Sequence, residues 1–309
     1  MRAVLVVNPT ATTTTARTRD VLVSALSHDL KVEVAETHGR GDGARLAAHA
    51  RQDGAELVVV LGGDGTVNEV VNGLLAAGPS VHVPRLALVP GGSTNVLARA
   101  LGLPRDSVEA TGLILQALRA QRERHVGLGT ANGRWFTFCA GLGFDAEVVR
   151  VVEQRRSAGR RASSGLYVRS AVRHFVTDVG GRRHPAITLE RPGEAPEPGL
   201  SLGIVANTAP WTYLKGRPVN PLPQASFDTG LDLLALRRLG TVRVIRHVMQ
   251  FLDGSARPPR GKDVLHLHDL SEFTLRAERP LMLQVDGDYA GETNTVRFTA
   301  VARALRVIV

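Results

Sequence analysis

The segment Gly62-Gly63-Asp64-Gly65 combines three glycines with one aspartate, and this combination is suited to holding phosphate. The glycines allow positive φ angles and leave backbone N–H groups uncovered. A helical pattern begins directly after them, and the N-terminus of a helix carries a partial positive charge that attracts anions. A carboxylate beside phosphate would repel it unless a divalent cation lay between them, so Asp64 favours phosphate chemistry with a metal ion. The competing interpretation of Asp64 is an ordinary turn aspartate.

Two nearby polar residues admit two interpretations. Thr66 and Glu69 have the Thr-x-x-Glu spacing of a capping box, in which each side chain bonds a backbone N–H at the start of the helix. They could equally belong to the phosphate site. The sequence leaves both possibilities open.

A strand and a helix must position this loop. The apolar run 57–61 is rich in β-branched residues and typical of a strand buried on both faces. Apolar residues then recur at helical spacing from Val67 to Leu75, and Gly78-Pro79 ends the pattern. The sequence therefore predicts a strand that turns through a glycine-rich loop into a helix.

A second strand, loop and helix follow in the same order. A strand is predicted over 85–89, then Pro90-Gly91-Gly92-Ser93-Thr94-Asn95, then a helix through Leu97 and Leu101. Two such loops on neighbouring parallel strands face one cleft at the carboxyl edge of a sheet. Ser93 or Thr94 could instead be the helix N-cap.

The earlier residues repeat this alternation. A strand over 2–7 ends at Asn8-Pro9, and a threonine-rich stretch, 10–15, leads into a helix with apolar residues at 21, 22, 25 and 26. A strand over 32–35 is followed by Thr37 and then by a helix over 44–52. The first part of the chain is therefore expected to be an α/β domain with a parallel sheet.

These motifs resemble those of the diacylglycerol kinase catalytic-domain family, the lipid kinases that also include sphingosine and ceramide kinases. Gly-Gly-Asp-Gly-Thr followed by Val-Asn-Glu-Val-Val-Asn-Gly is similar to the nucleotide loop of that family, whereas Gly-Gly-Asp-Gly alone also occurs in NAD kinases and 6-phosphofructokinases. The second loop resembles the family's Gly-Thr-x-Asn-x-x-Ala-Arg, and the family's Asn-Pro-x-Ser-Gly is kept here only at Asn8 and Pro9. The resemblance implies nucleotide binding by Asn8, Pro9, Thr10, Thr12, Thr37, Gly62, Gly63, Asp64, Gly65, Thr66, Asn68, Glu69, Gly92, Ser93, Thr94 and Asn95.

The alternation of strands and helices stops near 119–124, and the pattern then becomes mostly β. Asn132-Gly133 lies between two apolar runs and predicts a type I′ hairpin. Further strands are expected as a pair, 187–189 with 200–206, around a turn at 191–198. A strand beginning near 231, a helix over 242–252, a strand over 281–285 and a closing strand over 304–309 follow.

Two aspartates flank a glycine after the strand over 281–285. The family has Asp-Gly-Glu at this place, and the resemblance implies that Asp286 or Asp288 accepts the proton of the lipid hydroxyl, while Asp64 completes the catalytic set. As residues alone, two carboxylates around a glycine suit general-base work, although Asp-Gly is also a common turn. The family's Asp-Asp-Gly, linked to a structural magnesium site, is matched only by Asp228 and Asp232, with Thr229 at the second acidic position. Asp228 is otherwise interpreted as a turn aspartate.

The composition limits the function classes. The 309 residues carry a net charge of +9, mostly from arginine, and a single cysteine, which excludes an internal disulfide. We find no nucleic-acid-binding motif, no signal peptide and no apolar run long enough to span a membrane. A basic cluster, Arg155, Arg156, Arg160 and Arg161, is a candidate contact for anionic lipid or a solvated loop. We therefore expect a cytoplasmic protein, peripheral at the inner membrane face.

The sequence thus predicts an α/β nucleotide-binding domain over 1–124 and a β-sandwich-like, β-rich lipid-substrate domain over 125–309, with a closing strand, about 301–309, that can return to the first domain. The resemblance implies transfer of the γ-phosphate of ATP, with Mg²⁺, to a lipid hydroxyl, with diacylglycerol as the first candidate substrate. The alternatives are an NAD kinase-like enzyme and a non-catalytic lipid or nucleotide sensor of the same fold. The absence of Gly-x₄-Gly-Lys-Ser/Thr excludes the P-loop solution.

Overall fold

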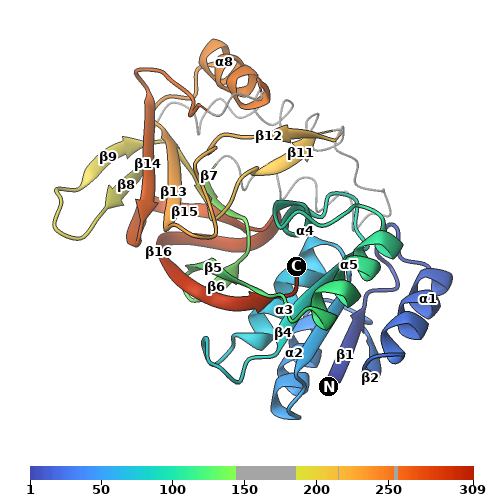
Figure 1. Cartoon of the computed structure of the whole chain (residues 1–309). Helices are drawn as coiled ribbons and strands as arrows, with labels where there is room; N and C mark the ends of the chain where they lie inside the picture. Colours follow the sequence, from blue (N-terminus) through green and yellow to red (C-terminus); the bar gives the residue numbers. More distant parts are fainter. Residues whose placement is uncertain (144–185, 215, 254–256) are drawn as a thin grey trace. The chain divides into compact units, whose positions relative to one another are not determined.

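The computed structural model describes residues 1–143, 186–214, 216–253 and 257–309, which form two compact units. Residues 1–128 together with 302–309 make up unit 1, and residues 129–301 belong to unit 2 (Figure 1). The expected basic cluster at Arg155 to Arg161 lies outside the described residues.

Unit 1 is built on a parallel sheet. Its four strands, in the spatial order β4-β3-β1-β2, are β1 (Arg2–Val7), β2 (Lys31–Glu36), β3 (Leu57–Gly62) and β4 (Arg85–Pro90). The end of a later strand joins them, because Val307 pairs in parallel with Leu86 of β4. The helices are α1 (Ala16–Ser27), α2 (Asp42–Gln52), α3 (Asp64–Leu74), α4 (Val96–Ala100) and α5 (Ser107–Arg119).

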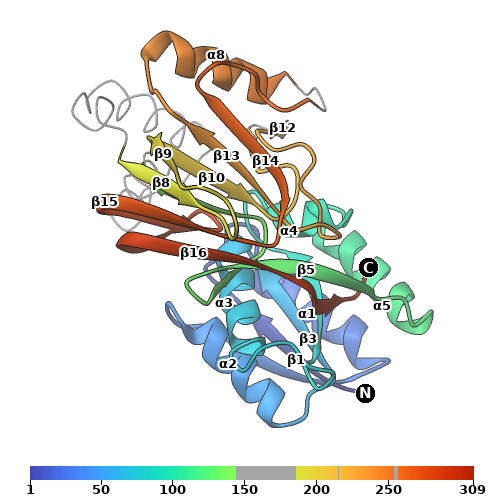
Figure 2. The ribbon, with the colours of Figure 1, turned by 90° about the vertical axis from the view of Figure 1, so that its left-hand side faces the viewer.

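Helices cover both faces of this sheet, which is why every residue of β3 is buried. On one face, Leu22 and Leu26 of α1 share an apolar cluster with Ile114 of α5 and with side chains of β1, β3 and β4. On the other face α2 and α3 pack against each other (Figure 2). Their approach is so close that a Cβ on Gly73 would lie 2.1 Å from the carbonyl oxygen of Ala44.

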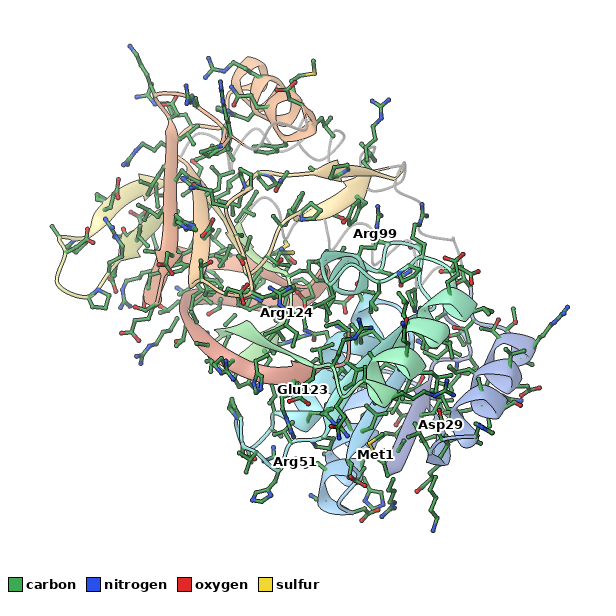
Figure 3. The ribbon with its side chains drawn as sticks, viewed as in Figure 1. Met1, Asp29, Arg51, Arg99, Glu123 and Arg124 are labelled. Carbon is green, nitrogen blue, oxygen red and sulfur yellow. The ribbon has the colours of Figure 1, made fainter. Side chains whose placement is uncertain are left out.

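Arginine side chains fasten the ends of these helices. Arg51, labelled in Figure 3, reaches from α2 and donates hydrogen bonds to the carbonyl oxygens of Leu74 and Gly78, where α3 ends. Arg119 pairs with Asp29, also labelled, at 2.8 Å and thereby joins the end of α5 to the turn after α1.

The predicted alternation of strands and helices over 2–101 is confirmed, and α5 is an element that we did not predict. Asp106 is its N-cap and accepts hydrogen bonds from the backbone N–H groups of Val108 and Glu109. The spacing Asp106-x-x-Glu109 is a helix-start signal that could have revealed this helix.

Unit 2 is dominated by antiparallel strands in the spatial order β14-β13-β10-β7-β15-β16. Its elements are β6 (Arg134–Phe136), β7 (Cys139–Gly143), β8 (Ile187–Glu190), β9 (Glu197–Leu200), β10 (Leu202–Ala206), β11 (Thr212–Leu214), β12 (Arg217–Val219), β13 (Leu231–Leu236), α8 (Thr241–Leu252), β14 (Val264–Leu270), β15 (Glu272–Val285) and β16 (Asp288–Val307). Strand β5 (Arg124–Ala131) enters the unit, and the end of β16, from residue 302 onward, belongs to unit 1. The expected division into an α/β part with a parallel sheet and a β-rich second part is confirmed.

Three phenylalanine rings meet in the otherwise aliphatic core of unit 2. Phe273 and Phe298 stack with their centroids 5.1 Å apart, and Phe136 meets Phe298 edge-on at 6.3 Å. These rings belong to β15, β16 and β6, so the core holds the long β15–β16 hairpin against the first strands of the unit.

The predicted hairpin at Asn132-Gly133 is confirmed. Both residues have positive φ angles, 49° and 82°, and Ala131 pairs with Arg134 across the two-residue loop.

The prediction that the strand over 187–189 pairs with the strand over 200–206 is wrong. Strand β8 pairs with β9, whereas β10 pairs with β7 and β13. The chain changes direction between β9 and β10: Gly199 has a φ of 83°, and the N–H of Ser201 donates to Leu236 at the end of β13.

Candidate active site

Glycine-rich loops of unit 1 meet at the carboxyl edge of its parallel sheet. Strands β3 and β4 are neighbours, with Gly62 paired to Pro90, so the loops that follow them emerge side by side. The N–H of Gly91 donates to the Gly62 carbonyl at 2.8 Å. A Cβ on Gly92 would lie 2.6 Å from the Cα of Gly63, so the two backbones touch.

This close approach explains why positions 62 and 63 are glycines, and the explanation differs from the one that we drew from the sequence. We interpreted Gly62, Gly63 and Gly65 as residues that allow positive φ angles, but none of the three uses one, and Gly63 has φ −94° and ψ −178°. Space is limited instead: a Cβ on Gly62 would lie 2.9 Å from the Thr66 side chain, and a Cβ on Gly63 would lie 3.2 Å from the Cα of Gly92. Close backbone approach also keeps N–H groups accessible to a phosphate.

Asn8 connects the loop after β1 to the first turn of α3. Its Nδ2 donates to the Thr66 hydroxyl at 2.8 Å, and its Oδ1 accepts from both the N–H and the hydroxyl of Thr10. Pro9 and Thr12 are exposed beside these bonds. The predicted residues Asn8, Thr10 and Thr66 are therefore brought together.

The capping-box interpretation of Thr66 and Glu69 is wrong, because α3 begins earlier, at Asp64, with Gly63 as its N-cap. The Glu69 carboxylate instead accepts hydrogen bonds from the N–H groups of Gly41 at 2.8 Å and Gly43 at 3.0 Å. Glu69 thus fixes the loop that leads into α2. Asn68, also predicted for the site, is buried, and Asn72 donates to its side-chain and backbone oxygens.

Asp64 occupies the first turn of α3, where the helix has an acidic residue and no side-chain cap. It is half-buried, and one carboxylate oxygen accepts a long hydrogen bond, 3.4 Å, from the N–H of Leu97 in α4. The first helical bond is donated by Val67 to Gly63, so the N–H groups of residues 64–66 precede it. The carboxylate of Asp64 and the N-terminus of α3 therefore lie together. This arrangement suits the binding of a phosphate with a metal ion, because the helix N-terminus attracts the anion and the carboxylate attracts the cation.

The second glycine loop is held by Asn95. This residue has a left-handed conformation, φ 52°, and its side chain both accepts from the Gly92 N–H and donates to the Gly92 carbonyl. Asn95 is the N-cap of α4, so the alternative that Ser93 or Thr94 caps this helix is wrong.

Thr37 and the loop after β2 lie at the same edge of the sheet. Thr37 is buried, and its N–H donates to Val7 at the end of β1. Asp42 closes the loop by accepting from the N–H groups of His38 and Gly39. The hydrogen bond from His38, followed by that from Arg45, lowers the pKa of Asp42.

Thr14 is a further polar residue of this edge that the sequence analysis did not single out. Its hydroxyl is buried with no hydrogen-bond partner among the described residues, and a Cβ on Gly91 would lie 2.6 Å from it. A buried hydroxyl without a partner beside a glycine loop is a candidate phosphate donor. Within a threonine run, no sequence signal distinguishes Thr14 from its neighbours.

The motif Asp286-Gly287-Asp288 forms the turn of the β15–β16 hairpin in unit 2. Asp286 and Gly287 have φ angles of 49° and 80°, and Val285 pairs with Asp288. The two carboxylates therefore have different positions: Asp286 is a turn residue, and Asp288 is the first residue of β16.

Asp286 is buried and accepts four hydrogen bonds. Its Oδ2 accepts from the N–H and the hydroxyl of Thr137, and its Oδ1 accepts from the N–H groups of Phe138 and Cys139. Burial raises the pKa of Asp286, while these four bonds act in the opposite direction. Asp288 is half-buried.

The predicted metal ligands lie in different environments. Asp228 is exposed in a turn, whereas Asp232 is fully buried, with one oxygen accepting from His268 at 2.7 Å and from the Asp269 N–H at 3.2 Å. Burial raises the pKa of Asp232 against these two bonds. Across the residues that the structure describes, no three His, Cys, Asp or Glu side chains form a group able to hold a metal ion. A metal at Asp228 and Asp232 stays a prediction.

Comparison with known proteins extends the similarity beyond the motifs. The model of the diacylglycerol kinase catalytic domain matches residues 2–131. A protein of Chromohalobacter salexigens named "Probable lipid kinase YegS-like" is 30% identical over 86% of this chain and 79% of its own length. A diacylglycerol kinase of Staphylococcus aureus is 31% identical over 94% of this chain and 87% of its own. The chain belongs to the diacylglycerol kinase family of kinases.

Solved structures agree in fold. A diacylglycerol kinase from Bacillus anthracis superimposes with a TM-score of 0.71 at 21% identity, over 99% of this chain and 96% of that one. An NAD kinase from Archaeoglobus fulgidus, solved with ATP, is a more distant neighbour. Its TM-score is 0.54 and its sequence identity 11%, over 100% of this chain and 94% of that one. None of the described helices has the length and apolarity needed to cross a membrane.

Proposed function

We propose that this protein transfers the γ-phosphate of ATP to the hydroxyl group of a lipid, with diacylglycerol as the first candidate acceptor and phosphatidic acid as the product. The choice of a lipid acceptor is supported by the family and by the names of relatives, which specify diacylglycerol or lipid kinases. The observation that carries the phosphate chemistry is the direct contact between the two glycine loops, Gly63 against Gly92. We place the enzyme in the cytoplasm, at the inner face of the membrane.

Residues at the carboxyl edge of unit 1 fit a nucleotide phosphate. The N-terminus of α3 supplies backbone N–H groups and a partial positive charge, and the Asn8–Thr66 bond fixes the loop beside it. Mg²⁺, when bound, offsets the negative charge of the phosphates, and the half-buried Asp64 carboxylate is the group that would hold it through water.

We assign proton removal to Asp288 and a positioning role to Asp286. Both oxygens of Asp286 accept hydrogen bonds from the segment 137–139, so this side chain is committed to holding the hairpin turn. Asp288 is the first residue after the turn and is only half-buried, so it remains the better candidate to accept the proton of the lipid hydroxyl as the phosphoryl group moves.

The test is ATP turnover with Mg²⁺ against diacylglycerol, monoacylglycerol, sphingosine and ceramide in mixed micelles, and against NAD in solution. Phosphorylation of one lipid, lost in Asp64→Ala and in Asp288→Ala, would support the proposal and identify the acceptor. Activity on NAD alone would contradict it and select the NAD kinase-like alternative. Binding of ATP and lipid without turnover would select the sensor.

A further inference from the structure

Helix α8 packs against unit 2 through one set of its described side chains. His247 is 1% exposed, and Phe251 packs against an apolar cluster that includes Leu234 and Leu236 of β13. The carbonyl oxygen of Phe251 accepts a hydrogen bond from the N–H of Asn220. These contacts define the inner side of the helix.

Apolar side chains occur on the outer side of α8. Met249 is 66% exposed and Leu252 is 37% exposed, and they are the exposed large apolar residues of unit 2 among those that the structure describes. Arg246, Met249 and Leu252 are spaced by three residues, which places them on one face of a helix.

Basic residues surround this apolar strip. The helix Thr241–Leu252 contains no acidic residue, and the exposed basic residues around it are Arg238, Arg246, Arg257, Arg260 and Lys262. Acidic residues nearby are the exposed Asp253 and the half-buried Asp263, whose carboxylate lies 3.9 Å from Arg238. The described charged side chains around α8 therefore have a strongly positive net charge.

The basic segment after α8 is fixed against the helix. The side chain of Gln250 accepts from the N–H of Arg260 at 3.2 Å and donates to its carbonyl oxygen at 3.4 Å. A Cβ on Gly261 would lie 2.6 Å from the guanidinium of Arg246. Arg260 is therefore held against the helix at Gln250, and Arg246 lies beside Gly261, the residue that follows Arg260. In both views α8 lies at the outer border of unit 2, beyond β14 (Figures 1 and 2).

We propose that α8, together with Arg257, Arg260 and Lys262, is a docking surface for an anionic lipid bilayer. A helix whose exposed side carries Met and Leu beside arginines is suited to lie in the headgroup layer, where the apolar side chains enter and the cations meet lipid phosphates. A soluble polyanion would be satisfied by the charge alone and would leave Met249 and Leu252 without a role. The inference rests on the proposed function, because the acceptor would be a membrane lipid.

The experiment measures co-sedimentation of the full chain with vesicles of phosphatidylcholine, and with vesicles of equal parts phosphatidylcholine and phosphatidylglycerol, without ATP. We expect the wild type to prefer the anionic vesicles, and the preference to weaken as salt is added. The triple variant Arg246→Gln, Arg257→Gln, Arg260→Gln should partition about a hundredfold more weakly into the anionic vesicles. Its matched control is Arg105→Gln, Arg122→Gln, Arg279→Gln, three exposed arginines elsewhere, which should change binding much less.

A second pair of variants tests the apolar component. Met249→Glu with Leu252→Glu should weaken vesicle binding at least about tenfold, whereas Val81→Glu with Val108→Glu, at positions 80% and 59% exposed, should have a smaller effect. A thermal melt of each variant checks folding. Equal binding to both vesicle types, equal losses in variants and controls, or capture of RNA in place of vesicles would overturn the proposal. Anionic-vesicle binding without any lipid phosphorylation would overturn the proposed function and leave the docking surface intact.

Discussion

Carboxylates that fix loops are spread over separate elements in unit 1, whereas in unit 2 the carboxylate that fixes a turn lies two residues from the proposed base. In unit 1, Glu69 and Asp42 accept backbone N–H bonds that fix loops, while the half-buried Asp64 accepts a longer bond, 3.4 Å, from Leu97. In unit 2, Asp286 fixes the turn, and the half-buried Asp288 is the residue that we propose as the base. Spacing along the chain therefore does not tell which carboxylate fixes a loop or turn and which is a candidate for chemistry. The two kinds are distinguished by the hydrogen bonds that each accepts and by its burial.

The largest effect is expected at Asp64. Asp64→Asn keeps the shape of the side chain but removes its charge, and turnover of lipid should fall by about a hundredfold or more. The free energy of unfolding should change by less than about 0.5 kcal/mol, because Asp64 is half-buried and the bond from Leu97 is long. Kinetic assays and urea denaturation check both parts. Asp20→Asn, at an exposed position of α1, is the control and should change neither quantity. A large loss of stability would place Asp64 with the loop-fixing carboxylates.

The two carboxylates of the turn should separate stability from activity. Asp286→Asn turns an acceptor into a donor that faces N–H groups, so the free energy of unfolding should fall by about 3 kcal/mol. Asp288→Asn should leave stability nearly unchanged and lower kcat by about a hundredfold. Denaturant unfolding and steady-state kinetics on both variants give the comparison. The reverse pattern would exchange the two roles.

A smaller effect is expected where the glycine loops touch. Gly92→Ala would put a Cβ 2.6 Å from the Cα of Gly63, and the loops must separate, which should cost about 1–3 kcal/mol of stability and weaken ATP binding. Gly112→Ala is the matched control: nothing lies within 4 Å of its Cβ position within helix α5, so the change should be neutral or stabilising by up to about 1 kcal/mol. Calorimetric binding of ATP and thermal melts measure both. Equal effects at the two positions would contradict the packing explanation.

The Asn8–Thr66 hydrogen bond should contribute less again. Asn8→Ala and Thr66→Val each remove one partner of the 2.8 Å bond, and the double variant should reveal a coupling of about 1 kcal/mol. Urea denaturation of the four proteins of this cycle supplies the value. Additive effects would mean that the loop after β1 and the first turn of α3 are joined by other contacts.

The smallest effect concerns pH. Hydrogen bonds from His38 and Arg45 lower the pKa of Asp42 in the folded state, so its carboxylate stabilises the fold above its unfolded pKa, and this stabilisation is lost as pH falls through the lower, folded pKa. Asp42→Asn should therefore be less stable than the wild type at neutral pH, and the difference should disappear in acid. Thermal melts from about pH 7 down to about pH 3 span the ordinary pKa of aspartate. A difference that does not depend on pH would show that the charge of Asp42 has no role.

Much of the fold of unit 1 could be predicted from the sequence, because its candidate site residues lie in loops that each directly follow a strand. Parallel strands bring such loops to one edge of the sheet, so local patterns were enough to place Asn8, Gly63 and Asn95 at this edge. The partners of these residues could not be predicted. That Glu69 bonds Gly41, or that Gly92 contacts Gly63, depends on the packing of segments distant in the chain.

Unit 2 was less predictable, because its structure depends more on contacts between segments distant in the chain. The pattern of polar and apolar residues indicates that a segment is a strand but not which strand lies beside it. We therefore assigned β10 to β8, although it pairs with β7 and β13. The Asp-Gly-Asp motif was recognised, but the four donors to Asp286 come from Thr137, Phe138 and Cys139, almost half the chain away.

The long last strand has a consequence for how the protein is made. Strand β16 begins in unit 2, and its residues from 302 onward complete unit 1, where Val307 pairs with Leu86. During synthesis these residues follow all of unit 2, so the edge of β4 stays unpaired while unit 2 is translated. An unpaired strand edge is a site for wrong pairing with other chains. We therefore expect newly made unit 1 to be prone to wrong pairing until residues 302–309 have been made, and the completion of its fold to come after the synthesis of unit 2.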